Sequence, residues 1–213
     1  PWGWGAADAG RGGGAPPRAG KRKEAGVRVA VFGVSGSGKS TLAGRLAAAL
    51  GVPHVELDAI NWQAGWRDLN IHDLPEFRRR VALAVVGEGW VSDGNYGRVR
   101  DLVLDRATHV VWLDYPRGLV MRRVAWRSLQ RALTRREIWP GTGNREAFRQ
   151  WLDADHPIRW AWRTYAEQRR AHAALLADPA LAHLEWHRLR RPGEVEPLLR
   201  RLRAENGGGS AGM

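Results

Sequence analysis

The stretch VRVAVFGVSGSGKST, from Val27 to Thr41, decides the fold that we expect for this chain. Five of the six residues from Val27 to Phe32 are apolar, and a short apolar run closed by a glycine is typical of a buried parallel strand. The segment TLAGRLAAAL, at 41–50, is rich in Ala and Leu and predicts a helix. The sequence therefore predicts a strand, a glycine-rich turn and a helix in direct succession.

The turn itself, GVSGSGKS from Gly33 onward, has the glycine, lysine and hydroxyl spacing of a phosphate-binding loop. Gly36 and Gly38 permit backbone torsions that let successive N–H groups point inward toward an anion, and the helix dipole adds to this field. Lys39 would bring a point charge to the β- and γ-phosphates, and Ser40 a hydroxyl to Mg²⁺. The expected phosphate-binding residues are Gly33, Ser35, Gly36, Ser37, Gly38, Lys39, Ser40 and Thr41.

The rarity of lysine strengthens this interpretation. Of the 34 basic residues only Lys21, Lys23 and Lys39 are lysines, and every other basic residue from Val27 onward is arginine. One lysine retained in such a sequence indicates a site that needs a compact charge rather than the planar fork of arginine. The alternative, a glycine-rich turn with an accidental lysine, requires the whole motif to have arisen by chance.

Length and composition place the motif in one domain. The 213 residues fit a single α/β domain at 27–205, with tails expected to be flexible at 1–26 and 206–213. The sequence has no cysteine and no apolar run near the ~20 residues of a membrane span, so we expect a cytoplasmic enzyme without a membrane partner. The net charge of +12 suggests nucleotide phosphates or nucleic acid as partners, but compositional drift explains it equally well. The oligomeric state stays open.

Further strands and helices alternate along the chain. Apolar runs predict strands at 54–58, 90–93, 108–114 and 184–189. Helical spacing predicts helices at 74–87, 98–105, 119–133, 156–177 and 194–203. Five strands alternating with helices predict a parallel sheet between two layers of helices.

Three carboxylates follow or end these strands, and ligands of parallel sheets bind at that edge. Asp58 would position an acceptor or accept a proton from its hydroxyl. Asp93 and Asp114 compete for a role in holding Mg²⁺, and Asp93 is favoured if its strand lies beside the first strand. Trp62 and Trp66 precede the next helix, and they would either stack on a flat substrate group or be buried against the domain.

An arginine-rich segment at about 122–160 has the composition of a lid. Between Arg117 and Arg149 there are nine arginines against two acidic residues, with a glycine-containing loop in the middle. Such a segment would close over phosphates and neutralise their charge. A solvated basic helix face is the alternative.

The chain resembles the nucleotide-kinase branch of phosphate-loop proteins, and within it the adenylate-kinase-like proteins of the topology-modulation (FlaR-related) group. The segments that carry the resemblance are GVSGSGKSTLA, HVELDAINW, WVSDGNY, VVWLDYP, GNRE and HRLRRPGEVE, spread over about 27–203. The resemblance implies a three-layer αβα fold, a sheet order of 2-3-1-4-5 and ATP at the loop. It places Asp93 near Mg²⁺, Arg98 near the acceptor, Arg145 in the lid and Arg191 beside the adenine. Asn95-Tyr96-Gly97 replaces the Phe-Pro-Arg of adenylate kinases, so the resemblance does not point to AMP as acceptor.

The leading functional hypothesis is Mg²⁺-dependent transfer of the γ-phosphoryl group of ATP to a small acceptor, either a nucleoside monophosphate or a hydroxyl metabolite. The expected catalytic residues are Lys39, Asp58, Asp93 and Arg145, with Ser40 and Asp93 on the metal and Arg191 on the nucleotide. The alternatives are a nucleotide-dependent regulator that binds nucleic acid and an ATPase switch without an acceptor.

Overall fold

A computed structural model describes residues 26–134, 139, 141–143 and 157–208 of the chain. The tail expected at 1–26, apart from Gly26, lies outside these residues, as do Arg145 and most of the expected lid loop. Among the described residues no helix is long and apolar enough to cross a membrane.

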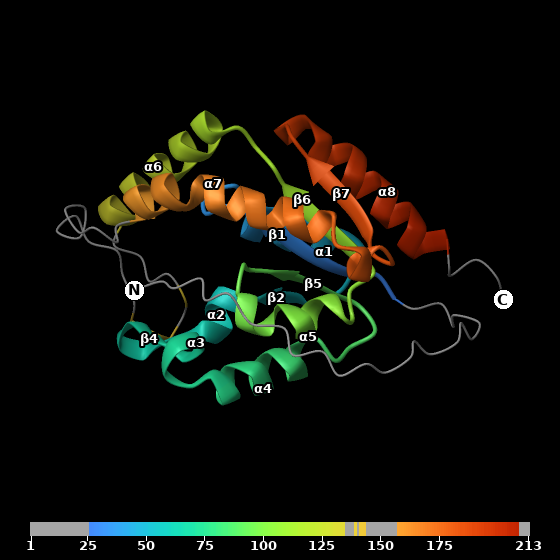
Figure 1. Ribbon diagram of the computed structural model, residues 1–213, viewed down its shortest axis with the longest axis horizontal. Coiled ribbons are helices and arrows are strands. Elements are labelled where there is room, and N and C mark those ends of the chain that lie inside the picture. Colours follow the sequence, from blue (N-terminus) through green and yellow to red (C-terminus); the bar gives the residue numbers. More distant parts are fainter. Residues whose placement is uncertain (1–25, 135–138, 140, 144–156, 209–213) are drawn as a thin grey trace.

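The centre of the fold is a five-stranded parallel sheet in the order β2-β5-β1-β6-β7 (Figure 1). Its strands are β1 (Arg28–Gly33), β2 (His54–Glu56), β5 (Trp90–Asp93), β6 (His109–Leu113) and β7 (Glu185–Leu189). Counted along the chain, this is the expected order 2-3-1-4-5, and the α/β fold class is confirmed. Because β5 and β6 flank β1, the segments that follow these three strands meet at one edge of the sheet.

Helices cover both faces of the sheet. The described α-helices are α1 (Lys39–Leu50), α2 (Leu57–Asn61), α3 (Leu69–His72), α4 (Leu74–Ala84), α5 (Arg100–Leu104), α6 (Arg117–Thr134), α7 (Pro157–Leu176) and α8 (Val195–Gly208). Alternation along β1 explains the two layers, because Val29 and Val31 belong to one buried cluster and Ala30 and Phe32 to the other.

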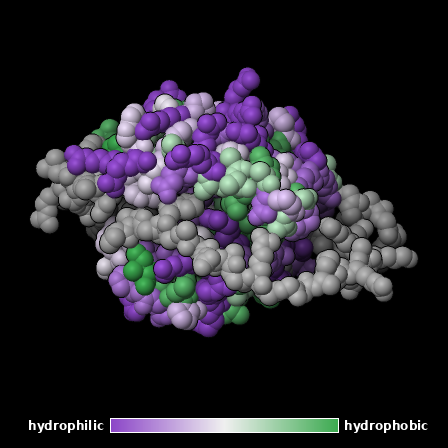
Figure 2. Space-filling model, viewed as in Figure 1, coloured by the Kyte–Doolittle hydropathy of each residue, from purple (hydrophilic) through white to green (hydrophobic). Residues whose placement is uncertain are grey.

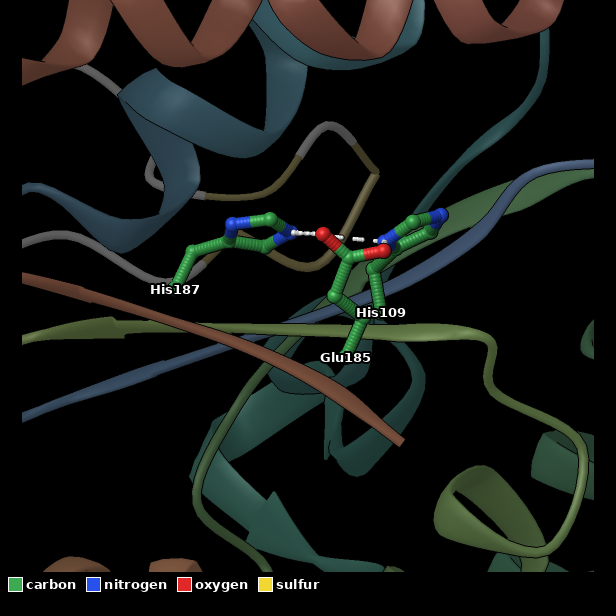
Figure 3. A group of neighbouring side chains, drawn as sticks. All are labelled: His109, Glu185 and His187. Atoms are coloured by element: carbon green, nitrogen blue, oxygen red, sulfur yellow. Dashed lines mark hydrogen bonds and ion pairs between the residues drawn. The ribbon is translucent and has the colours of Figure 1, made fainter. Parts of the chain in front are cut away.

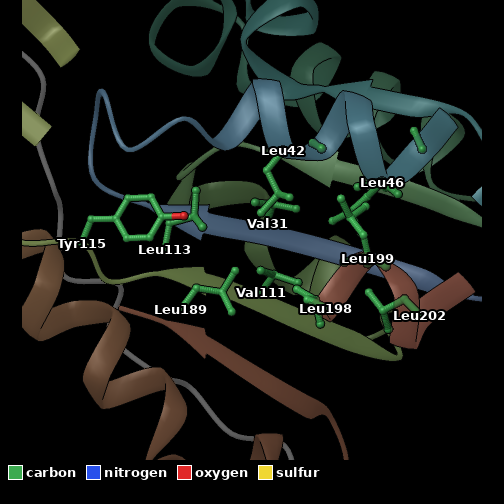
Figure 4. Packing of buried hydrophobic residues seen from close by; sticks show 14 of the residues in the cluster. Val31, Leu42, Leu46, Val111, Leu113, Tyr115, Leu189, Leu198, Leu199 and Leu202 are labelled. Atoms are coloured by element: carbon green, nitrogen blue, oxygen red, sulfur yellow. The ribbon is translucent and has the colours of Figure 1, made fainter. Parts of the chain in front are cut away.

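The first cluster joins the sheet to α1 and α8 (Figure 4). Leu42 of α1 lies over Val31 of β1, and Leu46 of α1 lies near Leu199 of α8 in the same cluster. The second cluster packs α4 and α5 on the opposite face, with Phe77 completely buried. Both faces of the central strands are therefore buried from solvent, as their continuous apolar sequences predict.

Two segments differ from the expectation. Residues 59–73, between the strand expected at 54–58 and the helix expected at 74–87, contain a small antiparallel pair for which no strand was expected, β3 (Trp62–Gln63) and β4 (Arg67–Asp68). Helix α8 continues to Gly208, beyond the expected end at 203, because Asn206 donates a hydrogen bond to the Leu50 carbonyl at 3.1 Å and ties the last turns to α1. The first part of the segment expected as a C-terminal tail is therefore helical.

Candidate phosphate-binding site

The loop from Val34 to Gly38 connects β1 to the start of α1, where backbone N–H groups lack helical partners. Gly36 and Gly38 have φ values of +80° and +98°, which glycine adopts at little cost. A Cβ on Gly36 would lie 2.1 Å from Cγ2 of Val124, so α6 leaves no room for a side chain there. The loop therefore presents its backbone directly to whatever binds at this end of the helix.

Two observations on the loop favour an anion as its ligand. The Gly38 N-cap position gives α1 no side-chain cap, and the first turn of α1 has no acidic residue. The Ser37 hydroxyl is buried, and within the described part of the chain it has no hydrogen-bond partner. Uncapped N–H groups at a helix start attract negative charge. The residues present therefore fit a bound phosphate group.

Lys39 lies between this loop and two carboxylates. Its ammonium donates a hydrogen bond to the Val34 carbonyl at 3.3 Å. Burial lowers the pKa of Lys39, and the positive charge of Arg127 acts in the same direction, although Asp58 and Asp93 oppose both. A desolvated cation beside free N–H groups is poised to pair with an anion, because binding replaces the hydration that it has lost.

The carboxylate of Asp93, at the end of β5, faces the start of α1. Ser40 Oγ donates to Asp93 Oδ2 at 2.6 Å, and His54 Nε2 lies 2.7 Å from Asp93 Oδ1. The hydrogen bond with Asp93 raises the pKa of His54, although burial opposes the change. The register that pairs Val31 with Asp93 brings this carboxylate beside the loop. A serine hydroxyl and a carboxylate side by side form an oxygen donor pair of the kind that Mg²⁺ prefers.

Asp114 at the end of β6 has different surroundings. Arg169 Nε and Arg188 Nη2 donate to its two oxygens at 2.5 and 2.6 Å. Burial favours a raised pKa for Asp114, but the hydrogen bonds from both arginines outweigh it and hold the pKa below its usual value. Both oxygens of Asp114 are therefore engaged by arginine, whereas Asp93 Oδ2 accepts a hydrogen bond from Ser40 at the start of α1.

Asp58 also interacts electrostatically with Lys39, and it belongs to α2 rather than to a strand. The sequence predicts a strand to 58, but β2 ends at Glu56, because Leu57 turns into the second core cluster and begins a helix. Tyr96 donates a hydrogen bond to Asp58 Oδ1 at 2.7 Å. Burial raises the pKa of Asp58, while Tyr96 and Lys39 limit the increase. Asp58 is thus a carboxylate with increased proton affinity close to Lys39.

Three tryptophans lie beyond Asp58 and form a cluster. Trp62 is buried, stacking on Trp139 at a centroid distance of 6.2 Å, and Trp66 meets both edge-on. Trp139 Nε1 also donates to Glu56 at 3.4 Å, and burial followed by the charge of Asp93 raises the pKa of Glu56. Trp62 therefore packs within the protein. The tryptophan cluster lies beside the carboxylates of Glu56 and Asp58.

The structure adds two arginines that sequence reasoning did not single out. Arg123 Nη1 donates to the Ser37 carbonyl at 2.7 Å, and its guanidinium lies 5.1 Å from the ring centre of Tyr115. Arg127, one turn further along α6, acts electrostatically on Lys39 and Asp58. Their spacing of four residues along α6 is the signal that would have identified them as neighbours on one helix face.

The remaining expected residues are placed as follows. Asn95 Nδ2 donates to the Gly33 carbonyl at 2.6 Å and fixes the start of the loop. Ser35 is half-buried, and Thr41 is exposed. Arg191 is exposed after β7, two strands from β1, and its backbone N–H donates to Glu194. Arg98 is also exposed, donating to the Asn70 carbonyl at 2.8 Å.

No model of a protein family and no curated protein matches this sequence. Among solved structures, the chain is similar to a shikimate kinase from Acinetobacter baumannii in complex with shikimate (16% identity, 89% of this chain and 97% of that chain, TM-score 0.49). It is also similar to a gluconokinase from Sinorhizobium meliloti 1021 (16%, 87% and 94%, TM-score 0.47). A third similar structure is a sugar kinase from Janibacter sp. HTCC2649 (20%, 82% and 91%, TM-score 0.44).

Proposed function

We propose that this protein binds ATP with Mg²⁺ at the loop 34–38 and transfers the γ-phosphoryl group to the hydroxyl group of a small acceptor. The observation that carries the proposal is the position of Lys39, a half-buried ammonium between the uncapped start of α1 and the carboxylates Asp58 and Asp93. A triphosphate would bring a further anion to this ammonium, on the side of the loop. The sheet has the expected strand order, which is consistent with the resemblance to nucleotide kinases.

At the phosphate end, the chain would act by positioning and by charge. The N–H groups of the loop and the Lys39 ammonium would hold the β- and γ-phosphates, which stabilises the negative charge that shifts during transfer. Arg123 already contacts the loop through the Ser37 carbonyl, and Arg127 contributes positive charge on the same side. Both arginines belong to the segment expected as a lid at about 122–160, and we propose that they neutralise phosphate charge together with Arg145.

Ser40 and Asp93 are the residues that would hold the metal ion. Bound Mg²⁺ would supply charge neutralisation at the phosphate oxygens. The hydroxyl of Ser40 and the carboxylate of Asp93 are already in contact, and His54 fixes the second carboxylate oxygen. These contacts keep Asp93 oriented toward α1, whereas the Arg169 and Arg188 bonds make Asp114 unsuitable.

At the acceptor end, Asp58 would serve as the base. Its carboxylate accepts the proton of the acceptor hydroxyl as the oxygen bonds to the γ-phosphorus and the bond to ADP breaks. The Tyr96 hydrogen bond holds the carboxylate, and its raised pKa increases its affinity for the transferred proton. A nucleoside monophosphate would bring a phosphate toward both Asp58 and Glu56, so the local charge favours an uncharged hydroxyl.

Arg191 remains the proposed nucleotide contact at the adenine, because it follows β7 at the same edge of the sheet as the loop. The nucleic-acid alternative stays an untested prediction. Part of the basic charge that motivated it is engaged within the protein, since Arg169 and Arg188 bind Asp114 and Arg117 donates to the Trp162 carbonyl.

A panel of nucleotides and acceptors tests the proposal. A non-hydrolysable ATP analogue with Mg²⁺, at about 100 times its dissociation constant, should raise the melting temperature by about 5–10 °C, because it binds only the folded state. With ATP, release of ADP should increase with sugars or polyols. No shift with any nucleotide would reject the site. Phosphorylation of nucleoside monophosphates alone would reject the hydroxyl acceptor and the proposed role of Asp58 as the base.

Asp93→Asn should raise the Mg²⁺ concentration that gives half-maximal phosphoryl transfer and lower the maximal rate by about 10²-fold. The amide keeps the shape of the side chain but loses the charge that would hold the metal. Initial rates measured over a range of Mg²⁺ concentrations at fixed ATP check this expectation.

Asp114→Asn is the matched control, because Asp114 also ends a strand beside β1. It should lower the melting temperature, since two arginines lose their buried partner, but leave the Mg²⁺ dependence as in the wild type. The reverse pattern, with the Mg²⁺ dependence changed only by Asp114→Asn, would assign the metal to β6.

A further inference from the structure

A cluster of two imidazoles and a carboxylate lies at the end of the sheet opposite the phosphate loop (Figure 3). His109 is the first residue of β6, Glu185 is the first residue of β7, and the register pairs them directly. His187 lies two residues along β7 and therefore points to the same face as Glu185. Because all strands are parallel, the starts of β6 and β7 face away from the loop that follows β1.

The three side chains turn their donor atoms toward one another. His187 Nε2 lies 3.3 Å from His109 Nδ1, and these nitrogens lie 3.7 and 3.6 Å from Glu185 Oε1 and Oε2 respectively. Tetrahedral zinc with bonds of about 2.0–2.2 Å separates its ligand atoms by about 3.3–3.6 Å. The donors are thus already near the spacing that such an ion requires, and side-chain movements of a few tenths of an ångström would complete it.

The surroundings of the cluster resemble those of known metal ligands. The other nitrogen of His109 lies 3.8 Å from a Glu205 carboxylate oxygen, a position from which a carboxylate can orient a coordinating imidazole. Arg201 of α8 pairs with both Glu185 and Glu205 and holds the two carboxylates in place.

Charge and access also permit a cation. One arginine against two glutamates leaves the group with a net negative charge when the imidazoles are neutral. The side chains of His109 and His187 are only 11% and 7% exposed, which shields the ligands, whereas that of Glu185 is 41% exposed and opens the cluster to solvent. An ion can therefore reach the site through the carboxylate side and bind among donors that are protected from water.

We propose that His109, Glu185 and His187 bind one divalent transition-metal ion of the zinc type, with a water molecule as the fourth ligand. Two imidazoles and one carboxylate suit Zn²⁺, Co²⁺ or Ni²⁺ and discriminate against Mg²⁺, which prefers oxygen ligands. The ion would tie the start of β6 to the start of β7 and so stabilise the edge of the sheet. The competing interpretation is a metal-free hydrogen bond between the two histidines.

Titration of the full chain with Co²⁺, followed by visible absorption, tests the proposal. The experiment is done in excess Mg²⁺, which occupies oxygen sites elsewhere, and Zn²⁺ is then added to displace the Co²⁺. We expect one equivalent of Co²⁺ to bind with tetrahedral absorption bands, and Zn²⁺ to raise the melting temperature. Absence of stoichiometric binding to the folded wild type would overturn the proposal in favour of the metal-free pair.

The variants localise the site. His187→Gln and His109→Gln should abolish stoichiometric binding, and Glu205→Gln should weaken it by about 10-fold or more. His183→Gln is the matched control, because His183 is an exposed histidine just before β7 and outside the cluster. This variant should bind Co²⁺ with the affinity of the wild type. If either buried histidine variant fails to fold by near-UV circular dichroism, the exposed Glu185→Gln decides. Wild-type affinity in that variant would contradict the site.

Discussion

Lys39→Ala should lower the rate of phosphoryl transfer by about 10³-fold or more while the protein remains folded. The ammonium lies beside the loop, donating to the Val34 carbonyl, and interacts electrostatically with the carboxylates of Asp58 and Asp93. Its removal takes from the β- and γ-phosphates the cation next to the loop, where negative charge moves during transfer. Initial rates of ADP release with the best acceptor of the panel measure the loss.

Stability separates this effect from misfolding. Burial lowers the pKa of Lys39, which means that the folded state carries a desolvated ammonium at some cost. Lys39→Ala should therefore keep or raise the melting temperature of the ligand-free protein. Lys39→Arg is the control for charge, and it should restore little activity because a planar fork does not match a compact ammonium site. Full activity in folded Lys39→Ala protein would remove the basis of the proposed function.

The second large effect is a loss of stability in acid caused by His172. This residue of α7 is buried, stacking on Phe32 at a centroid distance of 5.8 Å and lying against Trp112. Burial, followed by the charges of Lys39 and Arg100, lowers the pKa of His172 to about 3. The side chain must therefore be neutral in the folded protein.

The direction of the change in stability with pH follows from the lowered pKa of His172. Below about pH 6.5 the unfolded chain takes up a proton at His172 and the folded chain does not, so stability is present above this pH and is lost as the pH falls toward 3. The loss from this one group is about 1.4 kcal/mol per pH unit in that window. Urea unfolding at pH 7, 6 and 5 measures it as the slope of the free energy of unfolding.

His172→Phe should remove that part of the slope. The Nδ1 of His172 is buried without a hydrogen-bond partner among the described residues, so an aromatic ring of similar shape loses no bond there. His183→Phe, which changes an exposed histidine, should keep the wild-type slope. An unchanged slope in His172→Phe would show that His172 does not account for the acid sensitivity.

Much of the fold was predictable because its signals are local. The apolar runs of β1 and β6 are buried on both faces, and such strands read as continuous hydrophobic sequence. The glycine spacing likewise indicated the loop before α1. By contrast, the end of β2 was placed two residues too late, since Leu57 continues the apolar pattern although it begins a helix. Local sequence does not distinguish these two outcomes.

The candidate site was harder to predict from the sequence, because the residues that contact one another there come from distant segments of the chain. The contacts of Ser40 with Asp93 and of Tyr96 with Asp58 join residues 53 and 38 positions apart. Arg123 reaches the loop from a helix 86 residues further along the chain, and only the packing of α6 reveals which of many arginines does so. Hydrophilic side chains cover much of the face shown in Figure 2, with scattered hydrophobic ones among them. The functional cluster thus depends on tertiary packing more than on any motif.

The most direct test is a crystal structure with a magnesium-bound ATP analogue. We expect the β- and γ-phosphate oxygens within hydrogen-bond distance of the N–H groups of 34–40 and of the Lys39 ammonium, with the metal ion beside Ser40 and Asp93. A nucleotide bound elsewhere, with the loop empty or blocked, would contradict the account.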